Sequence, residues 1–243
     1  MSGYFTYNGV STATYGIYIT GDATYNVVNR NLDLQSVVGR SGDVVVDGGN
    51  YPNVEVTYHC GLEDPEGINE KLEEFAAALM TASGYRKLVD TYHPGVYRLG
   101  VVINPIKVTP YRPHGGLQHR AASFDVVFNC KPQKYLDSGD EIVTLQSSGS
   151  IHNPTAYPAS PILTITGKGT LTVAGQQITI GSGCPENEVT VECELMDAYG
   201  GTQLLNKYVT LPLSDITLAA GDNSIQLGSG ISRVKIKPRW WTL

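Results

Sequence analysis

Charge is scarce in this sequence. Asp, Glu, Lys and Arg make up 16% of the 243 residues, against about 25% in an average soluble protein. Acidic residues outnumber basic ones by 23 to 17, which gives a formal net charge of −6 at pH 7. A chain of this charge offers no general basic surface to a phosphate backbone, so we expect no specific nucleic-acid binding.

Long apolar runs are missing too. The longest extends from Phe75 to Met80, far short of the ~20 residues that cross a bilayer. The start, MSGYFTYNG, lacks the basic and then apolar regions of a signal peptide. We therefore expect no membrane insertion and a protein made in a reducing cytoplasm.

The short motifs that carry common enzyme chemistry are also missing. The sequence contains no G-x-G-x-x-G, Walker loop, G-x-S-x-G or H-E-x-x-H. His114 and His119 could share a metal, but a zinc site needs three or four ligands and no further ligand lies at a suitable spacing. We expect an exposed loop there, and we predict no catalytic residue, cofactor or metal.

Four cysteines could pair two by two. They are Cys60, Cys130, Cys184 and Cys193. Three lie in or beside strand-like segments, where cysteine usually packs as a small hydrophobic residue. We favour free thiols.

The sequence is rich in residues that form strands and turns, with 27 Gly and 15 Tyr. Val44–Val46 and Val54–Tyr58 flank Asp47-Gly48-Gly49-Asn50, which predicts a β-hairpin. A second hairpin should turn at His93-Pro94-Gly95. Alternation from Ser123 to Cys130 is typical of a half-buried strand.

One segment has helical spacing. Apolar residues recur every three or four positions from Ile68 to Met80, which predicts one apolar stripe. We expect Asp64 to cap this helix, with Pro65 at the first helical position. Gly84 suits its left-handed end.

Composition changes after Cys130. The segment from Lys131 to Pro161 holds four prolines with clustered Ser, Gly and Asp, which is typical of a passage between domains. An ordered strand is expected within it from Glu141 to Leu145. We place the two domains at residues 1–134 and 135–243.

The second domain is predicted to contain strands alone. Pro161–Thr166, Thr170–Val173 and Gln177–Ile180 are expected to form a meander. More short strands follow at similar spacing, a pattern typical of an antiparallel β-sandwich.

The C-terminus collects basic side chains. Four of them alternate with apolar residues and would share one face of a strand; they are Arg233, Lys235, Lys237 and Arg239. They could meet an acidic partner or protect an edge strand from stray pairing, and we favour the edge strand. Of Trp240 and Trp241, we expect one in the core and the other at a protein contact, in preference to a sugar platform.

The order of these features resembles the distal tail protein (Dit) family of long-tailed bacteriophages. The matching pieces begin with Asn31-Leu32-Asp33-Leu34 and Gly39-Arg40-Ser41-Gly42-Asp43, and in the second of these Ser41 replaces the family's usual Asn. They continue with Gly84–Leu88, Asp90–Pro94, Phe124–Gln133 and Pro238–Leu243. Each piece alone is weak, but in this order they cover nearly the whole chain.

The resemblance implies a mainly β fold. An N-terminal β-sandwich with one α-helix and an extended β-hairpin arm would precede a galectin-like antiparallel β-sandwich. The implied function is that of a structural virion protein, not an enzyme, made in the bacterial host cytoplasm. Six copies would form a ring at the tail tip, joining the tail tube protein to the baseplate hub protein and the receptor-binding protein.

The resemblance also implies contact residues. The arm around Asp47-Gly48-Gly49 would clasp the neighbouring subunit. Implied subunit-interface residues are Arg40, Asp43, Val45, Asp47, Tyr51, Val54 and Val56. Contacts to a partner or a saccharide would come from Arg233, Lys235, Lys237, Arg239 and Trp241. The alternative function is a carbohydrate-binding module that attaches a tail tip to cell-wall saccharides, and the third is a wall-degrading enzyme.

Overall fold

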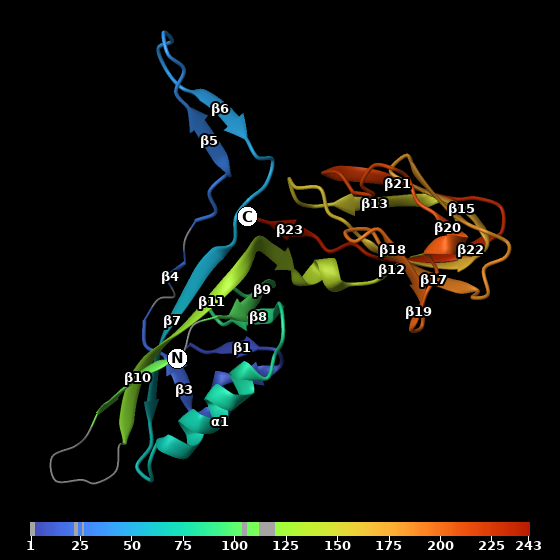
Figure 1. Cartoon of the computed structure of the whole chain (residues 1–243). Coiled ribbons are helices and arrows are strands. Elements are labelled where there is room, and N and C mark those ends of the chain that lie inside the picture. The colour runs from blue at the N-terminus through green and yellow to red at the C-terminus, as the bar shows by residue number, and fades with distance from the viewer. Residues whose placement is uncertain (1–2, 22–23, 26, 104–105, 112–119) are drawn as a thin grey trace. The chain divides into compact units, whose positions relative to one another are not determined.

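A computed structural model describes residues 3–21, 24–25, 27–103, 106–111 and 120–243. The chain divides into two compact units, Met1–Lys134 with Leu243 and Tyr135–Thr242. Both units consist mainly of strands, as predicted, and the first contains the one α-helix found among the residues just given (Figure 1).

The first unit is built on one large sheet. Its strands follow the order β2-β1-β8-β9-β11-β7-β3, with β10 paired to β11 and β4 to β7. Their bounds are β1 Phe5–Tyr7, β2 Val10–Ser11, β3 Ile17–Ile19, β4 Thr24–Tyr25, β7 Val54–Glu63, β8 Arg86–Asp90, β9 Val96–Val102, β10 Lys107–Tyr111 and β11 Ala121–Leu136. A short 3-10 helix, Thr12–Tyr15, separates β2 from β3.

The longest pairing in this sheet is the antiparallel pair β7–β11, in which Val126 lies opposite Tyr58. Along β11 the side chains of Phe124, Val126, Phe128 and Cys130 are all buried. This confirms the alternation predicted from the sequence. The hairpin predicted at His93-Pro94-Gly95 is also present, because β8 pairs with β9 across it.

The helix α1 spans Asn69–Met80 and begins later than predicted. Gly67 has φ 122°, so no continuous helix can include Pro65. The Asp64 carboxylate accepts the N–H of Glu66 at 2.9 Å instead and forms a turn before the helix. The expected cap at Asp64 and helical start at Pro65 were therefore wrong, and the helix ends before Gly84.

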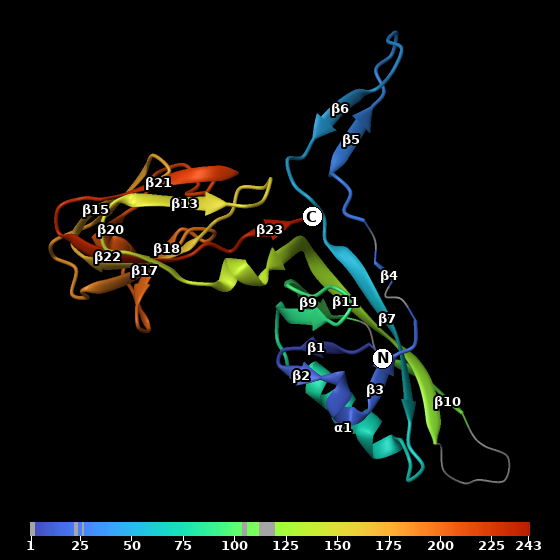
Figure 2. The ribbon, with the colours of Figure 1, turned by 180° about the vertical axis from the view of Figure 1, so that it is seen from behind.

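The core of the first unit is rich in aromatic rings. The ring centroids of Phe5 and Tyr58 lie 4.7 Å apart, and those of Phe5 and Phe128 lie 5.4 Å apart. From α1, Phe75 packs 6.1 Å from Phe124. The helix lies beside β1 and β3 in both views (Figure 1 and Figure 2). Its apolar stripe thus closes the core, as the spacing predicts.

The arm is a separate two-stranded sheet. It consists of β5, Leu32–Gln35, and β6, Val44–Asp47, and extends away from the large sheet (Figure 1). The predicted pairing of Val44–Val46 with Val54–Tyr58 was wrong, because β6 pairs with β5 and β7 with β11. Asp47-Gly48-Gly49 therefore lies at the base of the arm, and residues 36–43 form its tip.

The second unit consists of two sheets. One has the order β12-β22-β14-β17-β18-β19 and the other β13-β21-β15-β16-β20. Their bounds are β12 Val143–Leu145, β13 Gly149–Asn153, β14 Ile162–Gly167, β15 Gly169–Val173, β16 Gln176–Ile180, β17 Glu188–Glu192, β18 Asp197–Gly200, β19 Gln203–Leu204, β20 Val209–Thr210, β21 Gly221–Leu227 and β22 Ile231–Lys237. A last strand, β23, spans Trp241–Thr242. Leu163, Leu171, Ile225 and Val234 belong to one continuous buried core.

The predicted meander was wrong, because β14 and β15 belong to different sheets. The chain crosses at Gly167 and Gly169, with φ 110° and 146°. A Cβ on these residues would lie 2.1 Å from the carbonyl oxygen of Gly230 and 2.2 Å from that of Ser229. Only glycine fits such a crossing.

The segment predicted as a passage between domains is more ordered than its composition suggests. The strand expected from Glu141 to Leu145 is present as β12, and β13 follows it within the second unit. The sequence did not predict β13. Only one of its five residues, Ile151, is a strong strand former.

Candidate functional site

The arm carries four of the seven residues predicted at a subunit interface. Arg40 and Asp43 lie at its exposed tip, and Val45 and Asp47 lie on β6. Tyr51 lies between the arm and β7.

The last two predicted interface residues are not on a surface. Val54 and Val56 are 5% and 3% exposed and belong to the core of the first unit. Their predicted place at an interface between subunits was wrong, because both side chains pack inside the first unit and not on its outer surface. The prediction failed because β7 was taken to be part of the arm.

One face of the arm is mainly apolar and exposed, with the charged Asp47 opposite Leu32 at its base. Leu34 lies opposite Val45, and these side chains are 61% and 58% exposed. Leu32 shares their face at 47%, and Val38 at the tip is fully exposed. A lone hairpin of this kind is at best marginally stable in water, and clustered exposed apolar side chains mark interaction sites.

Polar contacts hold the base of the arm. The guanidinium of Arg30 lies 2.6 Å from the Asp47 carboxylate. The same carboxylate accepts the N–H of Gly49 at 2.9 Å. The Gly49 N–H and then the Arg30 guanidinium lower the pKa of Asp47. The side-chain amide of Asn31 donates to the Asn50 side-chain oxygen at 2.8 Å. This bond joins the segment that precedes β5 to the segment that follows β6.

In the second unit, the predicted basic row lies on β22. This strand sits between β12 and β14, so the expectation of an edge strand was wrong. Glu188 lies 3.4 Å from Arg233 and 3.5 Å from Lys235. Lys237 lies 3.0 Å from Asp140. Carboxylates of neighbouring segments therefore pair with the row.

Arg239 lies beyond the strand. It has φ 59°, its side chain is 13% exposed, and it donates to Glu194 at 2.5 Å. Trp240 is buried in the core, as expected for one of the two tryptophans. The Trp241 ring stacks on Tyr157 with centroids 4.6 Å apart and donates its Nε1–H to the Pro158 carbonyl at 3.0 Å. Tyr157 thus covers one face of Trp241.

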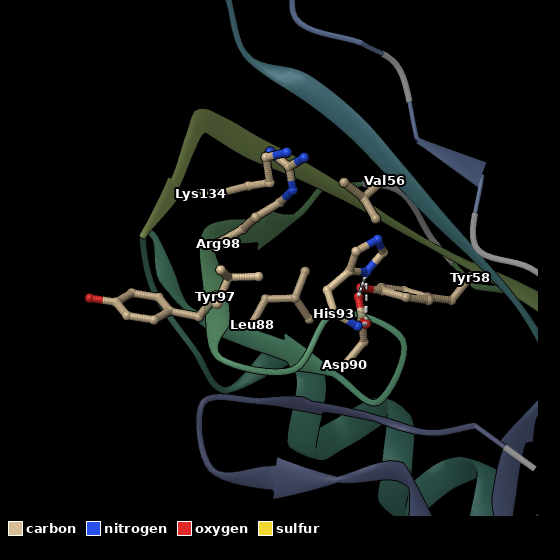
Figure 3. A pocket seen from close by; sticks show the side chains of 9 residues that line it. Val56, Tyr58, Leu88, Asp90, His93, Tyr97, Arg98 and Lys134 are labelled. Carbon is tan, nitrogen blue, oxygen red and sulfur yellow. Dashed lines mark hydrogen bonds and ion pairs between the residues drawn. The ribbon is translucent and has the colours of Figure 1, made fainter. Parts of the chain in front are cut away.

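The first unit contains a cavity of about 70 Å³. Strand β7, the β8–β9 hairpin and the end of β11 line it with Val56, Tyr58, Leu88, Asp90, His93, Val96, Tyr97, Arg98 and Lys134. Figure 3 shows Arg98 and Lys134 at one end of the cavity and Asp90 at the other. Sequence reasoning missed this site, because its residues come from segments far apart in the chain and match no motif.

Asp90 organises one end of this cavity. Its carboxylate accepts the Tyr58 hydroxyl at 2.7 Å and the backbone N–H groups of Tyr92 and His93 at 2.9 and 2.8 Å. The His93 Nδ1 lies 2.9 Å from the same carboxylate. Burial, followed by the charge of Asp90, raises the pKa of Tyr58. These contacts fix the carboxylate against the hairpin turn.

The other end of the cavity is cationic. The Arg98 guanidinium donates to the Pro132 carbonyl at 3.4 Å. Burial and then the Arg98 charge lower the pKa of Lys134. Like charges therefore face one another at this end.

No group of three or more His, Cys, Asp or Glu side chains suited to a metal occurs among the residues that the structure describes. His114 and His119 lie outside these residues. Within the same described ranges, no helix is both long and apolar enough to span a membrane. All four cysteines are free and buried, which confirms the expected thiol state.

No protein-family model and no curated protein matches the sequence. Among solved structures, the chain is similar to the Dit protein (gp 19.1) of SPP1, described as a paradigm of the hub adsorption apparatus in phages that infect Gram-positive bacteria. The two chains match over 100% of each, with a TM-score of 0.68 and 12% sequence identity. At this identity the likeness concerns the fold, and it is the distal-tail-protein fold that the sequence features resemble.

Proposed function

We propose that this protein is a structural component of a bacteriophage tail, a distal tail protein without catalytic activity that assembles as a homohexameric ring. The full-length likeness to a hub protein of a phage adsorption apparatus supports a structural role in a tail. The arm is the observation that carries the proposal of self-assembly.

The arm needs a partner for physical reasons. Its two strands pair only with each other among the described strands, which leaves both outer edges without backbone partners. Its apolar face, formed by Leu32, Leu34 and Val45, is exposed in the single chain. A neighbouring copy would bury this face and complete the strand edges. Repeated head-to-tail contacts of one kind close into a ring when the rotation allows.

The proposed place of the ring is the tail tip of the virion, after synthesis in the bacterial host cytoplasm. There it would join the tail tube protein to the baseplate hub and the receptor-binding protein. Because each copy carries a net charge of −6, the assembly would be strongly acidic. An acidic lumen lets DNA pass without holding its phosphates. Retention of DNA on the purified ring at low salt would contradict this part of the proposal.

The mass of the native assembly tests the proposal. We expect native mass spectrometry to give six times the chain mass of 26.2 kDa. A stable monomer at micromolar concentration would contradict the proposed self-assembly.

An arm deletion tests the mechanism of assembly. The Gly48 N–H already donates to the Asn31 carbonyl at 2.9 Å. A two-residue Asn-Gly turn can therefore replace residues 32–47 without moving the ends. We expect this variant to be a monomer with both cores folded.

Point variants on opposite faces of β5 give a matched comparison. Leu34→Ser removes an apolar contact from the proposed interface and should weaken the ring. Gln35→Ser changes the neighbouring residue, which points to the other face, and should leave the mass unchanged. Equal effects of the two variants would argue against docking through the apolar face.

The carbohydrate-binding alternative has less support. A sugar platform needs an open aromatic face, and Tyr157 already covers one face of Trp241. The basic row on β22 is paired with carboxylates. The contact role of Arg233, Lys235, Lys237, Arg239 and Trp241 stays a prediction, which binding to a glycan array would test.

A further inference from the structure

The cavity of the first unit is positively charged in an otherwise acidic protein. Its lining holds one carboxylate, Asp90, and two basic side chains, Arg98 and Lys134. These two basic groups outnumber the one carboxylate of the lining, whereas acidic residues outnumber basic ones in the whole chain. Such a local reversal of charge needs an explanation, because low-dielectric walls strengthen the field inside a cavity.

Lys134 has no compensating charge within the described part of the chain. Its ammonium makes no hydrogen bond or ion pair with any residue of that part, and its charged neighbour, Arg98, repels it. The one carboxylate of the lining, Asp90, is held at the opposite end by Tyr58, His93 and two backbone N–H groups. A half-buried ammonium facing a guanidinium is a place where an anion is stabilised.

The walls between the two ends are apolar. Val56 and Leu88 are 3% and 2% exposed, and Val96 lies beside them in the lining. Figure 3 shows the side chains of Val56 and Leu88 in this lining. Sites for small ligands commonly combine such walls with a few placed polar groups. A fully hydrated inorganic anion would gain nothing from these walls, whereas an alkyl chain would.

We propose that this cavity binds a carboxylate carried on a short alkyl stem. The carboxylate would lie between the Lys134 ammonium and the Arg98 guanidinium, and the stem would pack against Val56, Leu88 and Val96. The site belongs to the first unit alone and does not depend on ring assembly. It adds a ligand site to a protein otherwise proposed to be purely structural.

Butyrate is a direct probe of this site. We expect its titration into the full chain to give saturable chemical-shift changes in the methyl groups of Leu88, Val56 and Val96, followed by methyl NMR. Butanol carries the same stem without charge, and inorganic phosphate carries charge without the stem. Both should bind at least about tenfold more weakly than butyrate, since each lacks one half of the recognition.

Lys134→Met removes the charge and keeps the side-chain length. We expect the variant to weaken butyrate binding about tenfold or more, because it removes a charge-assisted contact. Lys134→Arg should restore the affinity. Lys207→Met is the matched control, since Lys207 lies in the second unit over the ring of Tyr208, and it should leave the affinity unchanged.

Three outcomes would overturn the inference. The first is the absence of saturable shifts with butyrate. The second is an equal affinity for butanol, which would show that charge plays no part. The third is an equal or higher affinity for phosphate, which would make the cavity a plain anion site. The spectrum of Lys134→Met without ligand shows whether the variant is folded. If it is not folded, the butyrate affinity of Lys134→Arg still tests whether a cation at this position is needed.

Discussion

The four thiols of this chain are shielded from solvent. Burial raises the pKa of Cys60, Cys130 and Cys193 to about 12. The thiolate is the reactive form, so a buried thiol with a raised pKa is inert near neutral pH. Cys184 is 2% exposed and equally enclosed.

We therefore expect a thiol assay with Ellman's reagent at pH 8 to detect almost no reaction in the native protein and four thiols after unfolding in guanidinium. One fast-reacting thiol in the native protein would contradict the burial described above. Fewer than four thiols after unfolding without reductant would reveal a disulfide.

Asp64 contributes pH-dependent stability. The Lys71 ammonium, followed by the Glu66 N–H, lowers the pKa of this carboxyl below its ordinary value of 3.8. The folded state therefore favours the charged form. The contribution is complete above pH 3.8 and is lost as the pH falls through the lowered folded-state value.

We expect Asp64→Asn to lower the melting temperature at pH 7, and the difference from the wild type to shrink in acid. Thermal unfolding followed by circular dichroism at several pH values measures both. Glu74→Gln, on the exposed face of α1, is the control and should change little. A difference that grows in acid would contradict the sign of the linkage.

At the level of single residues, the sequence predicted which side chains are buried better than which side chains contact one another. Alternation along β11 correctly identified Phe124, Val126 and Phe128 as buried. It could not bring Asp90 to Tyr58, which lies 32 residues earlier in the chain. Side-chain contacts at such separations depend on strand order, and local patterns do not contain it.

The helix α1 attaches to the sheet mainly through Phe75 and Leu79, each 1% exposed. The Phe75 ring lies 5.5 Å from that of Tyr15 and 6.1 Å from that of Phe124. Truncating such a ring leaves a cavity as well as losing apolar contact. Phe75 is therefore the side chain on which the helix contact most depends.

We expect Phe75→Ala to destabilise the first unit by about 3–5 kcal/mol. Denaturant unfolding measures the loss. Glu73→Ala, at an exposed position of the same helix, controls for helix propensity and should cost less than about 0.5 kcal/mol. A small effect of Phe75→Ala would mean that the helix is held by other contacts.

At the level of elements, the sequence predicted the existence of strands and failed on their partners. Asp47-Gly48-Gly49 has strong turn chemistry, and its Asp47 side chain does accept the Gly49 N–H. That turn joins the arm to the sheet and does not close a hairpin. Similarly, alternating cations on β22 suggested an edge, yet the strand is internal. Local residues define a turn or a face, while strand order follows from the whole chain.

The whole molecule has two separate hydrophobic cores. Phe128 belongs to the core of the first unit and Ile165 to that of the second. Both side chains are fully buried. Because no buried residue is shared between the two clusters, each core should respond to its own mutations.

We expect Phe128→Ala to raise hydrogen exchange in the first unit alone, after a loss of about 3–5 kcal/mol, and Ile165→Ala to do so in the second, after about 2–5 kcal/mol. Exchange followed by mass spectrometry of peptides from β7 and β14 separates the two responses. Joint loss of protection in both peptides with either variant would show that the units unfold as one.

For the whole molecule, the order of short segments along the sequence predicted the fold that the structural comparison supports at 12% identity. The cavity around Arg98 and Lys134 lay beyond such reasoning, since it forms only when β9 and the end of β11 come together. The number of subunits in an assembly also lies beyond the sequence, because the exposed fractions of Leu34 and Val45 describe a single chain.

The separate pairing of β5 with β6 makes the length of the arm independent of the rest of the fold. Since β7 takes its register from β11, residues added to both arm strands would leave the large sheet unchanged. Two extra residues on each strand would lengthen the reach by roughly 7 Å and keep Leu34 and Val45 on their present face. One extra residue would reverse the faces beyond it. Insertions into the arm should therefore be tolerated best in steps of two residues on each strand.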